Sequence, residues 1–527
     1  MAQCGKAGST MATASFLIEQ AAIAASRVTI AGWFTSQVAV RGDATALQQG
    51  ERTLSYRLLN DRVNRLVSWL AAQDIRRGDR IAVLSENRFE YVEVELAAAK
   101  LGVITACQNW RQADQELVHC IRAVEPKLVV VSERYAPTLE RLDHGVGQVV
   151  MLGEQYERAI AHANTSTEPP HLAEPEDGLI ILYTSGTTGM PKGAVISHRA
   201  MVSRTLIGSF DRPFAREDSY LAWTPMFHMG STDYIYSTLL RGGKVIVLDG
   251  FHPEIMARIV ATERLGWLHL NSAVIDRVIA QIKADKVQPK GVKLVGVMAD
   301  LVPRPQIAAL TTLMNAPFAN TFGSTETGPV PASKGVIDIG VVPERLSKLQ
   351  SSLCELRLVD ENGRYVADGE PGEALVRAPS LFSGYWNAPE VNAEVFRDGW
   401  YHMGDVFRRN GDGTLDFVDR RRYLIKSGGE NIYPAEIENT LLASARVANA
   451  VVVRRADAKW GEVPVVFVVR RDQHLTAADV ISLCRSQIAG YKVPKDVIFV
   501  ADEELPRSSS GKIKRHELES RLTGNGS

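Results

Sequence analysis

A run of hydroxyl, glycine and lysine side chains between residues 184 and 192 has the composition of a phosphate-binding loop. It follows the apolar stretch 179–182 and contains Thr184, Ser185, Gly186, Thr187, Thr188, Gly189 and Lys192. Glycines let backbone N–H groups approach a ligand, hydroxyls add hydrogen-bond donors, and Lys192 adds a positive charge. A flexible turn explains the small residues but neither the lysine nor the preceding strand. We therefore expect the loop to bind a polyphosphate, although the Walker A pattern is absent here.

Charged residues that suit the rest of a nucleotide site follow later in the chain. Glu326, in NTFGSTETG, offers the carboxylate oxygen that a hard cation such as Mg²⁺ prefers as a ligand. Asp405, in GWYHMGDV, is a carboxylate that can accept two hydrogen bonds. Arg420, in DRRRYLIKSGGENIYP, and Lys512, in PRSSSGKIKR, supply positive charge. Taken singly, such residues also fit a helix cap, a turn or a solvated basic tail.

Strand-like and helix-like runs alternate between residues 60 and 300. LNDRVNRLVSWLAAQ has apolar residues at helical spacing and precedes the strand-like RRGDRIAVLSEN. YVEVELAAAKLG is helix-like and ends at Gly102, where glycine suits a left-handed cap. KLVVVSE, GLIILYTS, KVIVLDG and VKLVGVMAD repeat the strand pattern. The alternation predicts an α/β fold with mostly parallel sheets, in which the loop at 184 leaves the end of a buried strand.

The pattern changes twice toward the C-terminus. From about 350, CELRLVDENGRYVADGEPGEALVRAP has strand-like runs joined by Gly, Asn and Pro turns, which predicts a β-subdomain over about 350–420. After 421, VANAVVVRR, PVVFVVRR, DVIFVAD and the helix-like AADVISLCRSQIAG form a compact α+β pattern. We expect an N-terminal domain over 15–420 and a small C-terminal domain over 421–527.

The bulk composition is that of a globular protein and excludes several classes. Hydrophobic residues make up 45% of the 527 and charged residues 23%. The net charge of −1 argues against nucleic acid as a partner. Five scattered cysteines without a CxxC pair favour buried thiols in a reducing compartment over disulfides or a zinc site. Every apolar run is too short to span a membrane, and Glu19 interrupts the first one, so we expect a cytoplasmic protein.

The motif YTSGTTGMPKG closely resembles the phosphate-binding signature of the adenylate-forming enzymes, which include acyl-CoA synthetases, luciferases and peptide-synthetase adenylation domains. The other motifs follow in that family's order along nearly the whole chain. The resemblance implies that ATP, Mg²⁺ and coenzyme A are the cofactors and that the small C-terminal domain is mobile. It also implies that the hydroxyl loop and Lys192 hold the β- and γ-phosphates.

The resemblance gives roles to the residues of NTFGSTETG. It implies that Phe322 lies against adenine, that Gly323 borders both the nucleotide and the acyl group, and that Thr325 lies near the α-phosphate. Glu326 is implied as the ligand of Mg²⁺.

The later motifs receive roles in the same way. Asp405 is implied to accept hydrogen bonds from the ribose hydroxyls, and Arg420 to contact ribose and phosphate. Lys512 is implied to bridge the substrate carboxylate and the α-phosphate during adenylation. Gly428 and Gly429 are implied to let the backbone pass close to the centre where the thioester forms.

Two further segments concern coenzyme A and the rotation between the half-reactions. DAKWGEVP resembles the segment that lies along coenzyme A, so Trp460 is implied to stack on the purine or to line the pantetheine tunnel; packing within its own domain is an equal alternative. The family's hinge falls near Arg422 and Tyr423, where the family often has an acidic residue.

The segment WTPMFHMGSTDY matches the part of the family that lies beside the acyl group. His228 is implied to gate or line that pocket, and Phe227, Met229 and Gly230 make it apolar. The segment has no arginine to meet a second carboxylate, so we do not expect a short dicarboxylate. Asp233 has the wrong spacing from Phe227 to hold an amino group, which argues against an amino acid.

One segment departs from the family. VGVMADLVPRP has Val297 and Met298 where the family usually has glycines, and Asp300 where it has proline. We expect the binding pocket to differ locally.

The leading hypothesis is an acyl-CoA synthetase that activates an apolar monocarboxylic acid, either fatty or bulky and cyclic. The acid would be joined to AMP with release of pyrophosphate and then transferred to coenzyme A. One alternative is a ligase that loads the phosphopantetheine arm of an acyl-carrier protein. The other is a nucleotide-binding module that has lost catalysis, which the presence of all five charged residues disfavours. Neither the oligomeric state nor the acid can be read from the sequence.

Overall fold

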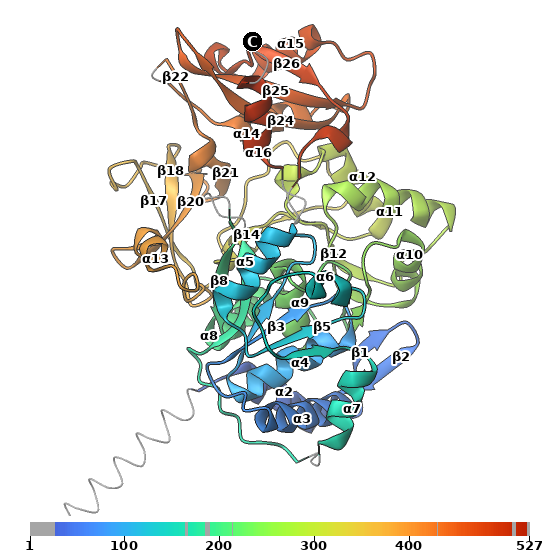
Figure 1. The fold of residues 1–527 in the computed structure, drawn as a ribbon. Coiled ribbons are helices and arrows are strands. Elements are labelled where there is room, and N and C mark those ends of the chain that lie inside the picture. Colours follow the sequence, from blue (N-terminus) through green and yellow to red (C-terminus); the bar gives the residue numbers. More distant parts are fainter. Residues whose placement is uncertain are drawn as a thin grey trace, which may run out of the picture.

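The computed structural model describes residues 27–163, 167–184, 190–212, 214–428, 430–507 and 513–523. Two sheets of mostly parallel strands, a smaller antiparallel sheet and a short hairpin make up the chain as far as Arg420. A fifth sheet begins at Ile425 and forms a separate body at the top of the molecule (Figure 1). The last sheet therefore begins five residues after the final strand of the antiparallel sheet, which ends at Arg420.

The first sheet has six strands in the order β6-β5-β3-β4-β7-β8. All its neighbours are parallel except β7 and β8, which form an antiparallel pair. Its strands are β3 (Arg80–Leu84), β4 (Ile104–Cys107), β5 (Leu128–Val131), β6 (Val149–Met151), β7 (Gly178–Thr184) and β8 (Lys192–Ser197). The helices interspersed among these strands are α3 (Tyr56–Ala72), α4 (Phe89–Leu101), α5 (Asp114–Val124), α6 (Ala136–Glu140) and α7 (Glu154–His162).

The second sheet has eight strands in the order β16-β13-β12-β11-β9-β10-β1-β2, parallel except for the two outer pairs. They are β1 (Thr45–Gln49), β2 (Arg52–Ser55), β9 (Ser219–Ala222), β10 (Val245–Val247), β11 (Leu265–Leu268), β12 (Val292–Val295), β13 (Phe318–Ala319) and β16 (Val336–Ile337). Its helices are α2 (Ile30–Arg41), α8 (His198–Asp211), α9 (Met229–Leu240), α10 (Pro253–Thr262), α11 (Ser272–Ala284), η1 (Ala299–Leu301) and α12 (Arg304–Met314).

Helix α4 is at the centre of the large body. All of its residues are buried, including Lys100, and one core cluster joins its apolar side chains to strands of both sheets. The Lys100 ammonium is satisfied because it donates to Asn60 Oδ1 and Asn64 Oδ1 of α3, each at 2.7 Å. Gly102 caps the helix with φ of 70°, as the sequence predicts.

The antiparallel β-subdomain follows. It contains β17 (Glu355–Val359), β18 (Pro371–Arg377), β19 (Phe396–Arg397), β20 (Trp400–Arg409) and β21 (Leu415–Arg420), with α13 (Pro389–Val395) beside it. The hairpin of β14 (Phe322–Ser324) and β15 (Gly328–Ala332) packs against it through a small apolar cluster. The turns at Gly363 and Gly413, both with positive φ, join strands where the sequence predicts hairpins.

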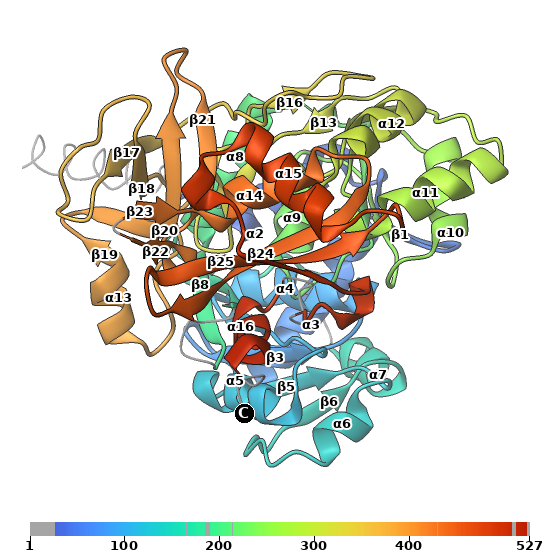
Figure 2. The same ribbon diagram turned by 90° about the horizontal axis from the view of Figure 1, so that it is seen from above.

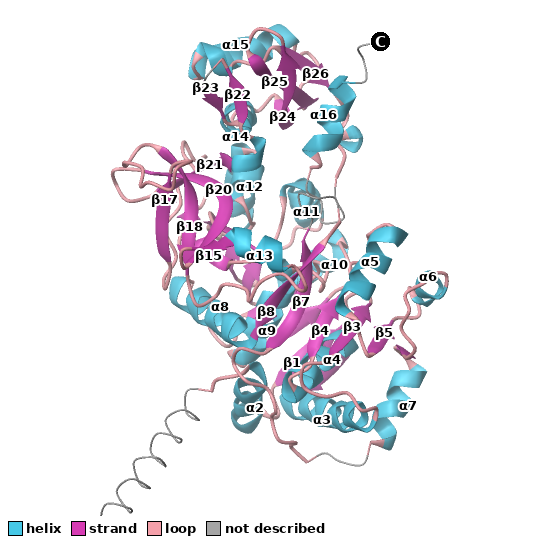
Figure 3. Cartoon of the chain, turned by 60° about the vertical axis from the view of Figure 1, so that its left-hand side comes forward, coloured by secondary structure: helices cyan, strands magenta, loops and turns pink. Residues whose placement is uncertain are grey.

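The C-terminal body is a five-stranded sheet with helices, and its strands β24 and β25 cross above the large body in Figure 2. Its elements are η2 (Arg421–Tyr423), β22 (Ile425–Ser427), β23 (Glu430–Ile432), α14 (Pro434–Leu442), β24 (Val447–Asp457), β25 (Gly461–Arg470), α15 (Ala477–Gln487), η3 (Gly490–Lys492), β26 (Asp496–Phe499), η4 (Asp502–Glu504) and α16 (Arg515–Thr523). Figure 3 shows this compact α+β unit standing apart from the larger sheets.

The structure refines two expectations from composition. Of the four cysteines in the described ranges, Cys107, Cys120 and Cys484 are buried free thiols, whereas Cys354 is only half-buried. No helix within the described ranges is long and apolar enough to cross a membrane.

Candidate functional site

The predicted phosphate loop joins two paired strands. Strand β7 ends at Thr184 and β8 begins at Lys192, and these two residues are register partners. Ser185, Gly186, Thr187, Thr188 and Gly189 lie outside the described residues. Both ends of the loop are therefore fixed to the six-stranded sheet, and the Lys192 ammonium lies 5.9 Å from the centre of the Tyr385 ring.

Tyr385 connects this lysine to the predicted magnesium ligand. Its hydroxyl donates to Oε1 of Glu326 at 2.8 Å. The Asn392 side chain holds the Tyr385 backbone by accepting from its N–H at 2.7 Å and donating to its carbonyl at 2.8 Å. Tyr385 also forms a β-bridge with Ala194 of β8. Nothing in the sequence around Tyr385 singled it out, since its contacts with Glu326, Lys192 and Ala194 come from distant segments.

Thr325 and Glu326 lie in a tight turn between β14 and β15. A side chain on Gly323 would place its Cβ 2.1 Å from the Gly328 carbonyl oxygen, so only glycine fits there. The Thr327 hydroxyl donates to the Val330 carbonyl at 2.6 Å and accepts from the Ser324 N–H at 3.1 Å. These bonds hold the turn in one conformation and leave Thr325 and Glu326 half-exposed.

A buried ion pair also holds the turn that carries Thr325 and Glu326. Arg204 of α8 donates to the Thr325 carbonyl at 2.8 Å and lies 3.3 Å from the Asp233 carboxylate of α9. Burial raises the pKa of Asp233, and Arg204 opposes that rise. The Asp233 carboxylate is therefore already paired with an arginine of α8. That the substrate is not an amino acid stays a prediction.

Asp405 and Arg420 face each other across β20 and β21. They are register partners, and Arg420 Nε lies 3.2 Å from Asp405 Oδ1. The nearby Asp405 charge raises the pKa of Arg420. Phe322 is buried against Phe407 and Phe417, with ring centres 5.0 and 4.6 Å away. The predicted contacts of these residues with ribose and adenine stay predictions.

The donor set around Glu326 fits magnesium bound to a nucleotide. Within the described residues, no group of three or more His, Cys, Asp or Glu side chains is arranged to hold a metal ion. A single carboxylate suits Mg²⁺, which keeps several waters and takes phosphate oxygens as its other ligands. Glu326 Oε1 is fixed by Tyr385, so the carboxylate is oriented before any ion binds.

The predicted acyl segment is anchored to the start of α9. His228 caps this helix, and its Nδ1 accepts from the Gly230 N–H at 3.1 Å. Phe227 is buried with its ring edge-on to Trp110 at 5.8 Å, and Met229 is half-buried. The segment is therefore apolar and rigid on the side of Phe227.

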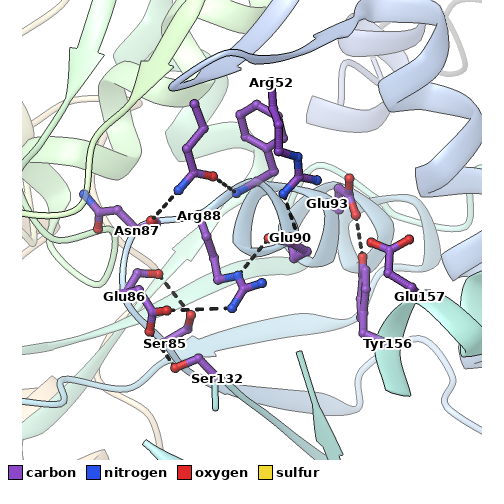
Figure 4. A network of polar contacts seen from close by, with 12 residues as sticks. Arg52, Ser85, Glu86, Asn87, Arg88, Glu90, Glu93, Ser132, Tyr156 and Glu157 are labelled. Carbon is purple, nitrogen blue, oxygen red and sulfur yellow. Dashed lines mark hydrogen bonds and ion pairs between the residues drawn. The ribbon is translucent and has the colours of Figure 1, made fainter. Parts of the chain in front are cut away.

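Asn87, just beyond the end of β3, fixes this segment to the first sheet. Its Oδ1 accepts from the Met226 N–H at 2.9 Å, and its Nδ2 donates to the carbonyl of Thr224 at 2.8 Å. Figure 4 shows Asn87 beside Arg88, which pairs with Glu86 and Glu90. The network ties the two parallel sheets together next to the acyl segment.

Aromatic side chains from α9 and from the end of β11 gather beside Gly230. The rings of Tyr234 and Trp267 are 4.6 Å apart, and the His269 ring is 5.6 Å from Trp267. The Arg212 guanidinium lies over Trp267 at 4.5 Å and is buried. The segment 223–234 has no arginine of its own, but the fold brings Arg212 close to it.

The segment that departs from the family makes contacts with both the second sheet and the β-subdomain. Met298 adopts a left-handed conformation with φ of 51°, where a glycine would be unstrained. Asp300 lies 2.8 Å from the fully buried Lys348 ammonium. Lys348 pairs with Leu415 of β21, so Asp300 links this loop to the β-subdomain. Val297 packs with Trp267.

Gly428 and Trp460, two of the residues predicted to serve thioester formation, lie together in the C-terminal body. Gly428 has φ of 61°, and its N–H donates to the Trp460 carbonyl at 2.7 Å. A Cβ on Gly428 would lie 2.7 Å from the Trp460 indole, which is 42% exposed. Gly429 and Lys512 lie outside the described residues.

The predicted hinge contacts the helix that follows Lys512. Arg515 of α16 lies over the Tyr423 ring at 4.8 Å and donates to Glu438 Oε2 at 2.9 Å. Asp419 accepts from the Ala435 N–H of α14 at 2.7 Å, and burial raises its pKa to about 6. The segment that joins the two bodies is thus held to the C-terminal body at Asp419 and at Tyr423, on both sides of Arg422.

Comparisons with known proteins agree with this arrangement. The family model described as AMP-binding enzyme matches residues 34–386, and the model of its C-terminal domain matches residues 436–512. An indoleacetate–CoA ligase from Aromatoleum aromaticum is 31% identical over 500 residues, covering 92% of this chain and 96% of that protein. A feruloyl-CoA synthase from Amycolatopsis sp. is 33% identical over 503 residues, covering 94% and 99%.

Solved structures share the fold over more than nine-tenths of the chain. ATP-bound MatB from Rhodopseudomonas palustris superposes with a TM-score of 0.81 at 26% identity and covers 94% of this chain and 99% of that one. The o-succinylbenzoate CoA synthetase from Bacillus subtilis, in complex with its acyl-adenylate, has a TM-score of 0.80 at 24% identity and covers 92% and 97%.

Proposed function

The chain belongs to the AMP-binding enzyme family, and we propose that it activates an aromatic or other bulky cyclic monocarboxylic acid. It is an AMP-forming acid–thiol ligase that works through an acyl-adenylate and uses ATP, Mg²⁺ and coenzyme A. The choice of acid and the role of each residue are the parts that we propose.

The first half-reaction joins the acid to AMP. The substrate carboxylate attacks the α-phosphorus, the bond to the β-phosphate oxygen breaks, and pyrophosphate leaves. Lys192 and the hydroxyl loop hold the β- and γ-phosphates, and Lys512 bridges the carboxylate and the α-phosphate. Mg²⁺, when bound, offsets the phosphate charge. Alignment and fixed charge supply most of the rate, because no protein nucleophile takes part.

The second half-reaction transfers the acyl group to coenzyme A. The thiol attacks the acyl carbon, and AMP leaves with the electron pair of the broken carbon–oxygen bond. Gly428, Gly429 and Trp460 serve this step from the C-terminal body. The carrier-protein alternative has less support, because the relatives are named as CoA ligases and a CoA synthase.

The observation that carries the choice of acid is the aromatic group formed by Tyr234, Trp267 and His269 beside Gly230. Flat rings pack well against such side chains, and aromatic pairs gain energy beyond the area that they bury. The Arg204 guanidinium is already paired with the Asp233 carboxylate, and the Arg212 guanidinium lies over one face of the Trp267 ring. Indoleacetate and ferulate, named for two relatives, are themselves aromatic acids.

A panel of acids tests the proposal. Pyrophosphate release would be measured with aryl acetates and cinnamates, with straight-chain acids of equal carbon number, and with aromatic dicarboxylic acids. We expect kcat/KM to be about tenfold or more higher for the aromatic monocarboxylates, the scale of a poorly filled apolar pocket. Preference for straight chains would overturn the aromatic assignment, and preference for dicarboxylates would give Arg212 a role in binding the second carboxylate.

A further inference from the structure

His269 lies directly after β11, at the carboxyl edge of the second sheet. Ligands of open α/β sheets bind beyond this edge. The ring Nδ1 is 3.0 Å from the Gly230 carbonyl oxygen, which also accepts from the Tyr220 hydroxyl at 2.9 Å. A Cβ on Gly230 would lie 2.8 Å from His269 Cε1. The imidazole is therefore packed tightly against the predicted acyl segment.

The hydrogen bond to Gly230 fixes the tautomer of His269. A carbonyl oxygen can only accept, so Nδ1 carries the proton and donates. Burial lowers the pKa of His269 to about 4, and the ring is neutral at pH 7. Nε2 is then an acceptor with a free lone pair.

The polar groups around His269 leave that acceptor without a partner. The indole N–H of Trp267 donates to the Gly296 carbonyl, and that of Trp223 donates to the His269 carbonyl, each at 2.7 Å. Among the residues that the structure describes, none gives Nε2 of His269 a hydrogen bond. Nε2 is also not one of the enclosed unpaired atoms, unlike Nε2 of His198. His269 as a whole is half-buried rather than enclosed, which leaves room for a ligand to reach Nε2.

We propose that Nε2 of His269 accepts a hydrogen bond from a hydroxyl or N–H group on the acyl part of the substrate, so that the preferred acid carries such a donor on its ring. The inference rests on the proposed function and narrows its substrate class. An acid without the donor leaves the acceptor unpaired once the site closes, and a site built for a hydrogen bond discriminates strongly against such an analogue.

Matched acids test the inference on the wild-type enzyme. Pyrophosphate release would be compared for 3- and 4-hydroxycinnamate, their O-methyl ethers and cinnamate. We expect at least one hydroxylated acid to exceed both its ether and cinnamate in kcat/KM by about tenfold or more. Equal values for all of them would overturn the inference while leaving the aromatic assignment intact. Activity with straight-chain acids alone would instead reject the proposed function.

Substitutions of His269 test whether this residue is the source of the preference for a hydroxylated acid. His269→Phe keeps the aromatic packing but removes the acceptor. The ratio of kcat/KM for the hydroxylated acid to that for its ether should therefore fall to about one. His269→Gln keeps an acceptor and should retain part of the preference. His252→Phe, at an exposed histidine bonded to the Asp249 carbonyl, is the control and should match wild type. A preference that persists in His269→Phe would overturn the inference, and His269→Leu serves the same purpose if His269→Phe does not fold. The ratio of two acids on one enzyme separates this role from a loss of stability, which lowers both rates.

Discussion

The hydroxyl of Tyr385 donates to the Glu326 carboxylate at 2.8 Å, and its ring lies 5.9 Å from the Lys192 ammonium. One side chain thus touches the group proposed to bind Mg²⁺ and the group proposed to hold the terminal phosphates. A fixed carboxylate costs less reorganisation when an ion binds.

Tyr385→Phe should weaken the use of Mg²⁺ more than the use of the acid. Removing the hydroxyl leaves the Glu326 carboxylate unanchored, and loss of such an outer partner typically costs about 10–100-fold in metal affinity or activity. We expect a higher Mg²⁺ concentration for half-maximal pyrophosphate release, weaker ATP binding by calorimetry in the presence of Mg²⁺, and little change in KM for the acid. Tyr365→Phe, at a tyrosine that is 65% exposed, is the control. An unchanged Mg²⁺ dependence would show that Glu326 does not rely on Tyr385.

The Arg204–Asp233 pair should be a large single contribution to stability near the site. Both side chains are almost fully buried, so removing one partner leaves a buried charge and costs about 3–5 kcal/mol. We expect Asp233→Ala and Arg204→Ala each to lower the free energy of unfolding in urea by an amount of this order, and the double variant to lose less than the sum. The exposed pair of Arg57 and Asp43 is the control, and Asp43→Ala should change stability little. Additive losses would mean that the two buried side chains act independently.

Local elements and long-range contacts differed in how far they could be predicted. The helix ending at Gly102 and the strand ending at Thr184 are encoded by nearby residues, and both are found. The contact of Tyr385 with Glu326 spans 59 positions, and that of Arg204 with Thr325 spans 121. Such pairs depend on sheet order and register, which a local pattern does not contain. No local pattern singled out His269, because its contact with Gly230 comes from the fold.

The stability of the chain should depend on Glu95 between about pH 5 and 8. Burial raises the pKa of this carboxyl, on the central helix α4, to about 8, and among the described residues the one side chain that opposes the rise is Cys107. The folded state therefore keeps the proton over a range in which the unfolded chain loses it, so the free energy of unfolding falls as pH rises, by about 1.4 kcal/mol per pH unit. Above pH 8 this contribution is constant.

Glu95→Gln should remove that slope, because the amide does not titrate. The measurement is urea unfolding of both proteins from pH 5 to pH 9, and the quantity compared is their difference, in which other titrating groups cancel. We expect the variant to gain stability relative to wild type as pH rises to 8. A difference that stays flat with pH would mean that Glu95 titrates alike in the folded and unfolded states.

Gly428→Ala should slow thioester formation more than adenylation. The added methyl group would meet the Trp460 indole at 2.7 Å, and the positive φ disfavours a side chain, so the loop next to the proposed coenzyme A path must move. We expect transfer from a supplied acyl-adenylate to coenzyme A to fall by about tenfold or more, since small misplacements near a reacting centre have large effects. Exchange of labelled pyrophosphate into ATP should change little.

Lys512→Ala should give the opposite profile. Loss of one fixed positive charge at the α-phosphate typically lowers the rate by about 10²–10³. Pyrophosphate exchange should therefore collapse while transfer from a supplied acyl-adenylate survives. Lys514→Ala, at a neighbouring lysine paired with Glu517 at 2.9 Å, is the matched control and should leave both half-reactions intact. If Lys512→Ala and Gly428→Ala impaired the same half-reaction, the C-terminal body would not present the Lys512 segment and the Gly428 loop to the site in separate steps.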